Sequence, residues 1–310
     1  MAYLWNPTLA SDINYFSEQQ IAYIDGARAA AAQLPFLRSR PANAMNTKYI
    51  PNHMPSTYQQ KQGAGPSPRQ LSKGRTVTAT ELRLENSTVL DRKAQMAMLM
   101  GGNDANEILR AMGTAYIWTL HIHGIDLLMN DAFSTNWQDE GVPFYSASHP
   151  TNYGATQSNR LESAFDMAAF KLACVMLDKT LGYDGSYQSR RPGYVLVASD
   201  AGPDTTEIIN GIIRVPVPGT VAATPQGYGY QGASFIGSSG LQGAVSSPVI
   251  EDSDAWALLS DEFALEVLVV DPPMPKREPL PGTRDEIISD EAIVQLLVKS
   301  WRDAIGGGPA

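Results

Sequence analysis

The sequence has one cysteine, Cys174, among 310 residues, and it has no long apolar run. A single cysteine excludes a disulfide framework, a thiolate metal cluster and a redox pair within the chain. No segment reaches the roughly 18 consecutive apolar residues that a membrane helix needs, and Met1–Asn6 lacks the pattern of a signal peptide. We therefore expect synthesis in the cytoplasm, no membrane partner, and stability that comes from packing and association.

Basic residues are in the minority, since 23 Lys and Arg stand against 32 Asp and Glu. A net charge of -9 argues against a dedicated nucleic-acid binder, which neutralises phosphates with clustered bases. The charges are uneven: residues 41–80 contain no acid, whereas residues 251–310 carry thirteen acids and five bases. We predict that the bases of residues 41–80 contact acids of another copy. These bases are Lys48, Lys61, Arg69, Lys73 and Arg75.

The first 80 residues indicate an arm followed by a long loop. Residues 17–34 are rich in alanine and favour a helix without a large apolar stripe. Residues 41–80 are rich in Pro, Gly, Gln, Ser and Thr, and so long a loop inside a compact domain is usually functional or disordered. The flanks at 46–54 and 75–84 have strand character. We predict a two-stranded arm that projects from the body.

Helical periodicity dominates the following segment. Residues 90–100 and 104–133 repeat apolar positions at spacings of three and four, with a break at Gly101 and Gly102. Asp104 is the expected N-cap of the second helix, with a capping box completed by Glu107. By the same reasoning a further helix begins at Ser158 and Asn159 and ends near residue 181.

The second half of the chain alternates buried strands with turns. A continuous apolar run predicts a strand at 194–198, and a helix follows at 203–212. Residues 216–243 are rich in Gly, Pro, Thr and Ser, which indicates an extended surface region. Residues 292–301 fit a strand or a helix, and we find no internal repeat. Further strands are predicted at 244–250, 256–260 and 265–270.

Two histidine motifs have simpler interpretations than catalysis or metal binding. His121 and His123 lie in a predicted helix, where positions two apart do not share a face, and no third ligand follows at suitable spacing. Ser148 stands next to His149, but no G-x-S-x-G motif supplies the strained turn that a serine nucleophile needs. We expect no metal, and a turn at residues 146–150.

Glycine-rich and acidic runs carry no cofactor pattern. Residues 228–232 and 237–240 lack the phosphate-binding G-x-x-x-x-G-K-[ST] sequence. The acidic pairs between residues 251 and 291 lack EF-hand spacing, and such runs are usually solvated faces. We predict no catalytic residue and no cofactor. Trp256 and Trp301 lie in apolar contexts, where each fits either the core or a hot spot between subunits.

The middle of the chain carries the most specific pattern. Residues 141–150 read GVPFYSASHP, residues 157–161 read QSNRL, and residues 191–197 read RPGYVLV. In order, and in spacing to within one residue, they resemble the major head subunit family of Mu-like phages, which shares F-S-x-x-H-P, a short gap, S-N, a helix and P-x-x-L-V. Residues 245–258 are similar to that family's strand, turn and tryptophan segment.

The resemblance implies a Hong Kong 97-like capsid fold of the α+β class, with an N-terminal arm, an extended β-hairpin loop, a peripheral domain with a long spine helix, and an axial domain. It implies a major capsid protein of a tailed bacteriophage, which forms hexamers and pentamers and an icosahedral shell around double-stranded DNA. Portal, scaffolding or decoration proteins are further expected partners, in a virion assembled in the host cytoplasm. The expected segments are 1–40 (arm), 41–80 (loop), 81–190 (peripheral domain), 191–268 (axial domain) and 269–310 (return to the peripheral domain).

Two other functions stay open at this point. An encapsulin-type compartment shares the fold and encloses protein cargo, so the contents of a purified shell separate it from a phage head. An α/β hydrolase-like enzyme would use Ser148 or His149, and a screen of ester and phosphate substrates with His149→Ala would reveal it. Because the nucleophile motif is missing, the sequence favours a structural protein and not an enzyme.

Overall fold

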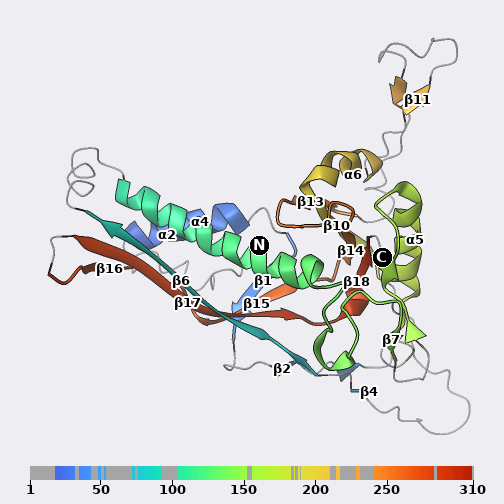
Figure 1. Cartoon of the computed structure of the whole chain (residues 1–310), viewed down its shortest axis with the longest axis horizontal. Coiled ribbons are helices and arrows are strands. Elements are labelled where there is room, and N and C mark those ends of the chain that lie inside the picture. Colours follow the sequence, from blue (N-terminus) through green and yellow to red (C-terminus); the bar gives the residue numbers. More distant parts are fainter. Residues whose placement is uncertain are drawn as a thin grey trace, which may run out of the picture. The chain divides into compact units, whose positions relative to one another are not determined.

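A computed structural model describes most of the chain (Figure 1). The described residues are 18–31, 35–42, 48–49, 52–53, 72–73, 76–91, 104–151, 156–182, 185, 188, 190–209, 214–216, 228–230, 241–282 and 285–308. They mix helices and strands, which confirms the predicted α+β class. The predicted helix at residues 92–100, and most of the surface region at 216–243, lie outside the described residues.

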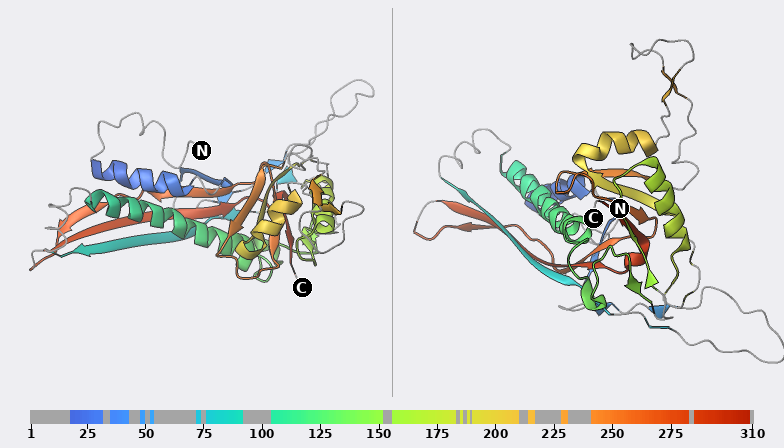
Figure 2. Two further views of the ribbon diagram at one scale, coloured as in Figure 1. Left: turned by 90° about the horizontal axis from the view of Figure 1, so that it is seen from above. Right: turned by 45° about the vertical axis from the view of Figure 1, so that its right-hand side comes forward.

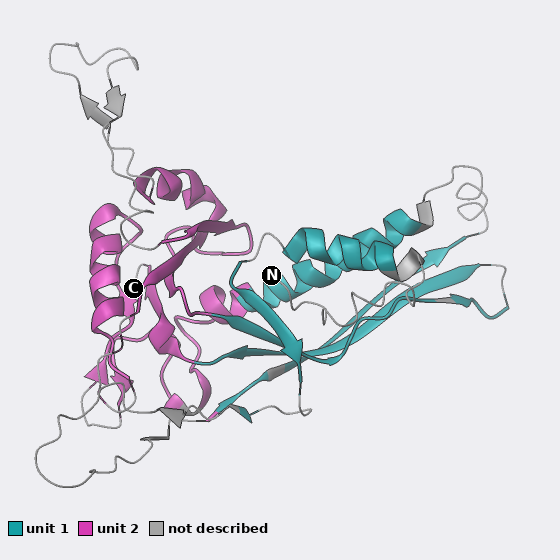
Figure 3. Ribbon diagram, turned by 180° about the vertical axis from the view of Figure 1, so that it is seen from behind, with its two compact units in different colours: residues 1–49, 77–124, 264–299 teal, residues 50–76, 125–263, 300–310 magenta. Residues whose placement is uncertain are grey.

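The chain divides into two compact units, and each unit is built from three separate stretches of sequence (Figure 3). Unit 1 comprises Met1–Tyr49, Val77–Gly124 and Ala264–Lys299. Unit 2 comprises Ile50–Thr76, Ile125–Phe263 and Ser300–Ala310. The five segments expected from the resemblance stay a prediction.

Unit 1 is a five-stranded sheet with two helices on one face. The strand order is β1-β15-β17-β16, and β6 pairs with the long strand β17. Helices α2 (Glu18–Ala31) and α4 (Asp104–Ile125) lie side by side over the sheet in both views of Figure 2. Tyr23, Leu109 and Ile288 join helices and sheet in one apolar cluster. The strands are β1 (Leu37–Pro41), β6 (Thr80–Leu90), β15 (Leu265–Asp271), β16 (Lys276–Pro279) and β17 (Glu286–Val298).

The two helices of unit 1 cross through a glycine contact. A Cβ atom on Gly113 of α4 would lie 2.1 Å from the carbonyl oxygen of Tyr23, and one on Gly26 of α2 would lie 2.0 Å from that of Arg110. Real Cβ atoms do not approach backbone so closely, so each helix leaves room for the other only where it carries glycine. Ala22 and Ala27 are buried beside this crossing, which explains why the helix is rich in alanine.

Unit 2 is a second five-stranded sheet, in the order β13-β10-β14-β18-β9. Helix α5 (Met167–Lys179) and helix α6 (Gly202–Ile209) share an apolar cluster with the sheet. The cluster includes Phe170, Leu177, Ile209, Val195 and Leu258, which are almost completely buried. The strands are β9 (Arg160–Leu161), β10 (Pro192–Ala198), β13 (Gly243–Ser247), β14 (Trp256–Ser260) and β18 (Ala304–Gly307).

Several smaller elements complete the described chain. A π-helical turn at Asp126–Asn130 follows α4. Short 3-10 helices lie at Gln138–Glu140, Ser199–Ala201 and Trp301–Asp303. The remaining short strands are β2 (Lys48–Tyr49), β3 (Asn52–His53), β4 (Ser72–Lys73), β5 (Val77–Thr78), β7 (His149–Pro150), β8 (Thr156–Gln157), β11 (Arg214–Pro216) and β12 (Tyr228–Tyr230).

Three predicted helix boundaries are wrong. Leu90, where the first helix was expected to begin, is the last residue of strand β6 and pairs with Glu286 of β17. The helix expected at 104–133 ends as α-helix at Ile125 and continues only as the π-helical turn. The helix expected from Asn159 begins at Met167, where Asp166 accepts a hydrogen bond from the Ala169 amide as the true N-cap. The ambiguous segment at 292–301 is mainly strand β17.

Candidate assembly surfaces

The structure places strands on both sides of the long loop, as predicted. Strand β2 pairs with β5, and β3 pairs with β4, both antiparallel. Lys48 lies on β2 with an exposed side chain, and Lys73 lies on β4. Lys61, Arg69 and Arg75 lie outside the described residues. The contact between these bases and another copy therefore stays a prediction.

The residues of the most specific sequence pattern meet in a buried polar cluster of unit 2. Asn159, completely buried, is its centre. Its Nδ2 donates to the carbonyl oxygens of Phe144 (2.9 Å), Trp301 (3.3 Å) and Ala304 (3.2 Å). Its Oδ1 accepts from the amide of Ser146 at 2.9 Å. One side chain thus joins the 144–146 segment to the segment around β18. The capping pattern had assigned Asn159 a local role, and its actual contacts are long range.

His149 completes this cluster, and its environment argues against the hydrolase interpretation. Its Nδ1 lies 2.9 Å from Oε2 of Glu140, and its Nε2 lies near the Phe144 carbonyl (3.1 Å) and Oδ1 of Asn159 (3.0 Å). Both ring nitrogens therefore face acceptors, and the ring is 0% exposed. Neither nitrogen is free to take a proton from Ser148. At residues 146–150, where a turn was predicted, the chain bends at Ala147, with Ala147 and Ser148 exposed, and then enters strand β7.

Both tryptophans left open by the sequence belong to the core of unit 2. Trp301 is fully buried and stacks on His149, with ring centroids 3.8 Å apart. Its Nε1 donates to Oε1 of Glu140 at 3.3 Å. Trp256 is also fully buried, and its Nε1 donates to the carbonyl of Ser163 at 2.9 Å. Because buried indole N–H groups need such acceptors, these contacts fix both rings within the unit.

The histidine pair at 121 and 123 lies on α4, as predicted. His121 is buried, and burial lowers the pKa of its imidazole. Its ring meets that of Trp118 edge to face at 5.2 Å. Among the residues that the structure describes, no group of three His, Cys, Asp or Glu side chains is placed to hold a metal ion. None of the described helices is long and apolar enough to cross a membrane.

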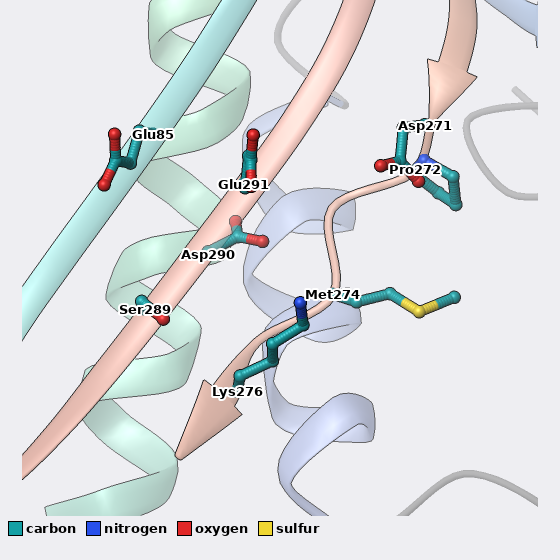
Figure 4. A pocket seen from close by; sticks show the side chains of 8 residues that line it. All are labelled: Glu85, Asp271, Pro272, Met274, Lys276, Ser289, Asp290 and Glu291. Carbon is teal, nitrogen blue, oxygen red and sulfur yellow. The ribbon is translucent and has the colours of Figure 1, made fainter. Parts of the chain in front are cut away.

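Strand β17 has an interruption in its pairing that opens a cavity in unit 1. On one side Ser289 pairs with Lys276 of β16, and Ile293 pairs with Asp271 of β15. Between these positions the connection of residues 272–275 replaces a paired strand. A cavity of about 160 Å³ lies here (Figure 4). We call it the acidic pocket, and its lining residues are Glu85, Asp271, Pro272, Met274, Lys276, Ser289, Asp290 and Glu291.

Charge is unbalanced in the acidic pocket. Four carboxyl groups and one ammonium group line it. Glu85 and Glu291 are direct partners in the β6–β17 ladder, and like charges placed opposite each other destabilise a sheet. Asp290 is only 6% exposed; its Oδ2 accepts from the hydroxyl of Tyr23, while its Oδ1 accepts no hydrogen bond. The pocket is therefore a place where the isolated chain is less stable than it could be.

No family model and no curated protein sequence matches this chain. Solved structures do match over nearly its whole length. A chain of the virus-like particle from Pyrococcus furiosus matches with a TM-score of 0.55 and 11% identity, over 95% of this chain and 99% of that one. A chain of the satellite phage P4 procapsid, which includes the size determination protein, matches with a TM-score of 0.53 and 13% identity, over 98% of this chain and 95% of that one. The chain has a phage capsid fold.

A third similar structure adds to this likeness. The capsid of an empty GTA particle matches with a TM-score of 0.50 and 12% identity, over 91% of this chain and 90% of that one. The capsid fold predicted from residues 141–197 is thereby confirmed. The Mu-like subfamily stays a prediction, because none of these structures specifies it.

Within this capsid fold, Asp290 provides a prediction about pH. Burial raises the pKa of its carboxyl, and hydrogen bonds from Tyr23 and from the backbone of Glu291 and Met274 oppose this only in part. Because its pKa is raised, the carboxyl holds its proton in the folded chain at pH values where the unfolded chain has lost it. The free energy of unfolding therefore falls as the pH rises from about 3.8, the pKa in the unfolded chain, through the higher pKa in the folded chain. We expect Asp290→Asn to raise the free energy of unfolding of the subunit at pH 7, since an amide oxygen can still accept from Tyr23.

Denaturant unfolding of the subunit between pH 3 and pH 8 checks this. The gain of Asp290→Asn over the original chain should shrink toward zero below pH 3.8, where both folded and unfolded chains hold the proton. Asp261→Asn, at an exposed position, is the matched control and should show no such trend. A constant difference at all pH values would contradict the assignment to Asp290.

Proposed function

We propose that this chain is the major capsid protein of a tailed bacteriophage, which assembles as hexamers and pentamers into an icosahedral shell around double-stranded DNA. The observation that carries the proposal is the match to capsid and procapsid chains over at least nine-tenths of both chains. The proposal includes no enzymatic activity and no cofactor. Portal, scaffolding or decoration proteins complete the proposed set of partners, in a virion built in the host cytoplasm.

A second candidate is an encapsulin-type compartment shell. The observation that favours it is the similarity to the virus-like particle from Pyrococcus furiosus, with a TM-score of 0.55. Both candidates share the assembling subunit and differ in what they enclose. Purified shells that contain DNA and a portal vertex support the phage head, whereas shells that contain a cargo enzyme support the compartment.

Negative-stain electron microscopy of the purified protein, with light scattering for mass, tests the proposal. We expect closed shells or ring-shaped capsomers. A chain that stays monomeric or dimeric under all conditions would overturn both shell functions. Since a closed shell uses one sequence in positions that differ slightly in angle, subunit contacts must tolerate small rotations. Polar, charged contacts made by a long loop meet that need.

The bases of the long loop provide the next prediction. We expect that the triple variant Lys61→Glu, Arg69→Glu and Lys73→Glu needs about tenfold more protein for half-assembly, because reversing charges at a contact costs on the order of 1.4 kcal/mol or more. Shell yield by sedimentation measures this. The control variant Lys61→Arg, Arg69→Lys and Lys73→Arg keeps the charges and should assemble normally. Equal yields of all three proteins would contradict an electrostatic contact.

A further inference from the structure

The acidic pocket has the composition of a binding site for a cation. Its carboxylates outnumber its ammonium group four to one. Within the part of the chain that the structure describes, none of the four acids is in an ion pair. Among the described bases of unit 1, Arg40 and Lys299 bind Glu266, and Arg83 binds Glu81. Buried Asp290 and the facing pair Glu85 and Glu291 both lower the stability of the folded chain. Such destabilising groups are expected at functional sites, where binding of a partner offsets their cost.

The shape of the acidic pocket selects the kind of cation. The described acids do not converge as metal ligands. The cavity of about 160 Å³ has room for the end of a side chain, and the carboxylate of Asp290 lies between β17 and the connection that carries Met274 (Figure 4). Met274 is half exposed beside the cavity, and it offers an apolar surface to the aliphatic stem of a long side chain. A lysine or arginine side chain satisfies all of these features.

We propose that the acidic pocket of one subunit receives a lysine or arginine side chain from residues 41–80 of a second copy. The argument for this occupant is charge: residues 41–80 contain five Lys and Arg and no acid, so this segment is attracted to a pocket with excess carboxylates. The inference rests on the proposed function, because it needs subunits that assemble. It adds the receiving site, with Glu85 and Glu291 at its rim and Asp290 as its buried acceptor.

Charge reversal on each side separately, and then together, tests the contact. The pocket variant is Glu85→Lys with Glu291→Lys, which replaces one like-charge pair by another and so leaves the repulsion within the ladder similar. The loop variant is Lys61→Glu, Arg69→Glu and Lys73→Glu. We expect each variant alone to need at least about tenfold more protein for half-assembly, by the free energy of one lost charged contact. Glu251→Lys with Glu262→Lys, at exposed positions outside the pocket, is the control.

Co-expression of the two variants, each with its own tag, is the decisive arm. In the mixture each reversed loop can find a reversed pocket on the other chain wherever the two chains alternate, so we expect mixed assemblies at a clearly higher yield than either variant gives alone. If one chain with all five reversals assembles but the mixture does not, the loop contacts its own chain and the proposal is overturned. The milder variant Glu85→Gln with Glu291→Gln serves if the lysine pair prevents folding, and it should weaken assembly in the same direction.

The outcomes separate this inference from the proposed function. If the original protein assembles and the pocket variants assemble equally well, the acidic pocket is not a subunit contact and the shell function stands. If the original protein never assembles, both fall together. A loss of assembly in the control that equals the loss in the pocket variant would show a general effect of charge, and it would also overturn the inference.

Discussion

Replacing Asn159 by aspartate is expected to lower the free energy of unfolding by about 4 kcal/mol or more, because several buried polar groups lose their partners at once. The amide nitrogen donates to the carbonyls of Phe144, Trp301 and Ala304. An ionised aspartate presents an oxygen to these three carbonyl oxygens. A protonated aspartate keeps one donor at most. The shape of the side chain is unchanged, so the loss reports the lost hydrogen bonds and the burial of a carboxyl group, and it does not report a change in packing.

Chemical denaturation of the purified subunit measures the effect of Asn159→Asp, with far-ultraviolet circular dichroism as the signal. Asn136→Asp is the matched control, because Asn136 is an exposed residue of the same unit, and it should change stability by less than about 0.5 kcal/mol. A loss below about 1 kcal/mol at position 159 would mean that the cluster around His149 and Trp301 does not hold these segments together.

The second large effect is expected at the helix crossing of unit 1. We expect Gly113→Ala to destabilise the subunit by about 3 kcal/mol, although alanine favours a helix over glycine by about 1 kcal/mol. The added Cβ would lie 2.1 Å from the carbonyl oxygen of Tyr23, so α2 and α4 must move apart. That movement reduces the burial of Tyr23 and Met112. Because the cost of the lost packing exceeds the gain in helix propensity, the net change in the free energy of unfolding is a loss.

Thermal unfolding of Gly113→Ala, compared with Gly243→Ala, checks this result. A Cβ on Gly243 has no atom within 4 Å, so that substitution should be close to neutral. Increased stability of Gly113→Ala would show that the helices tolerate a wider separation, and the glycine contact would then have no structural importance. The same test at Gly26 should give a loss of similar size, since its Cβ would lie 2.0 Å from the Arg110 carbonyl.

Strands made of continuous apolar residues were predictable because their pattern is local. Residues 256–260 form β14 with the predicted bounds, and residues 194–198 lie within β10. Both strands have buried side chains on both faces, so their sequences are continuously apolar and do not alternate between apolar and polar residues. Such a run is recognised as a buried strand from neighbouring residues alone. These two strands are neighbours in the sheet of unit 2.

The failures arose where a local pattern has a long-range use. Asn159 followed by Glu162 fits a capping box, yet Asn159 binds the backbone near β18, more than 140 residues away. Leu90 begins a run of residues with helical period, but it pairs with Glu286 of β17 at the end of strand β6. In both cases the competing contact comes from a segment that sequence order does not bring near.

The candidate site was only half predictable from the sequence. The basic segment was visible because charge composition is a property of neighbouring residues. The acidic pocket was not, since Asp290 and Glu291 were among the acidic pairs assigned to a solvated surface. Only the register of β6 against β17 places Glu85 opposite Glu291, and only the break between β15 and β16 exposes Asp290 to a cavity.

The interleaving of the two units determines when this protein can fold during synthesis. Unit 1 needs residues 264–299 for its central strands, and unit 2 needs residues 300–307 because β18 lies between β14 and β9. Residues up to about 299 must therefore leave the ribosome before the sheet of unit 1 is complete, and residues up to 307 before the sheet of unit 2 is complete, so the two units cannot fold strictly one after the other. Nascent chains on one messenger RNA consequently present no finished sheet to each other until residues 299 and 307 have been made.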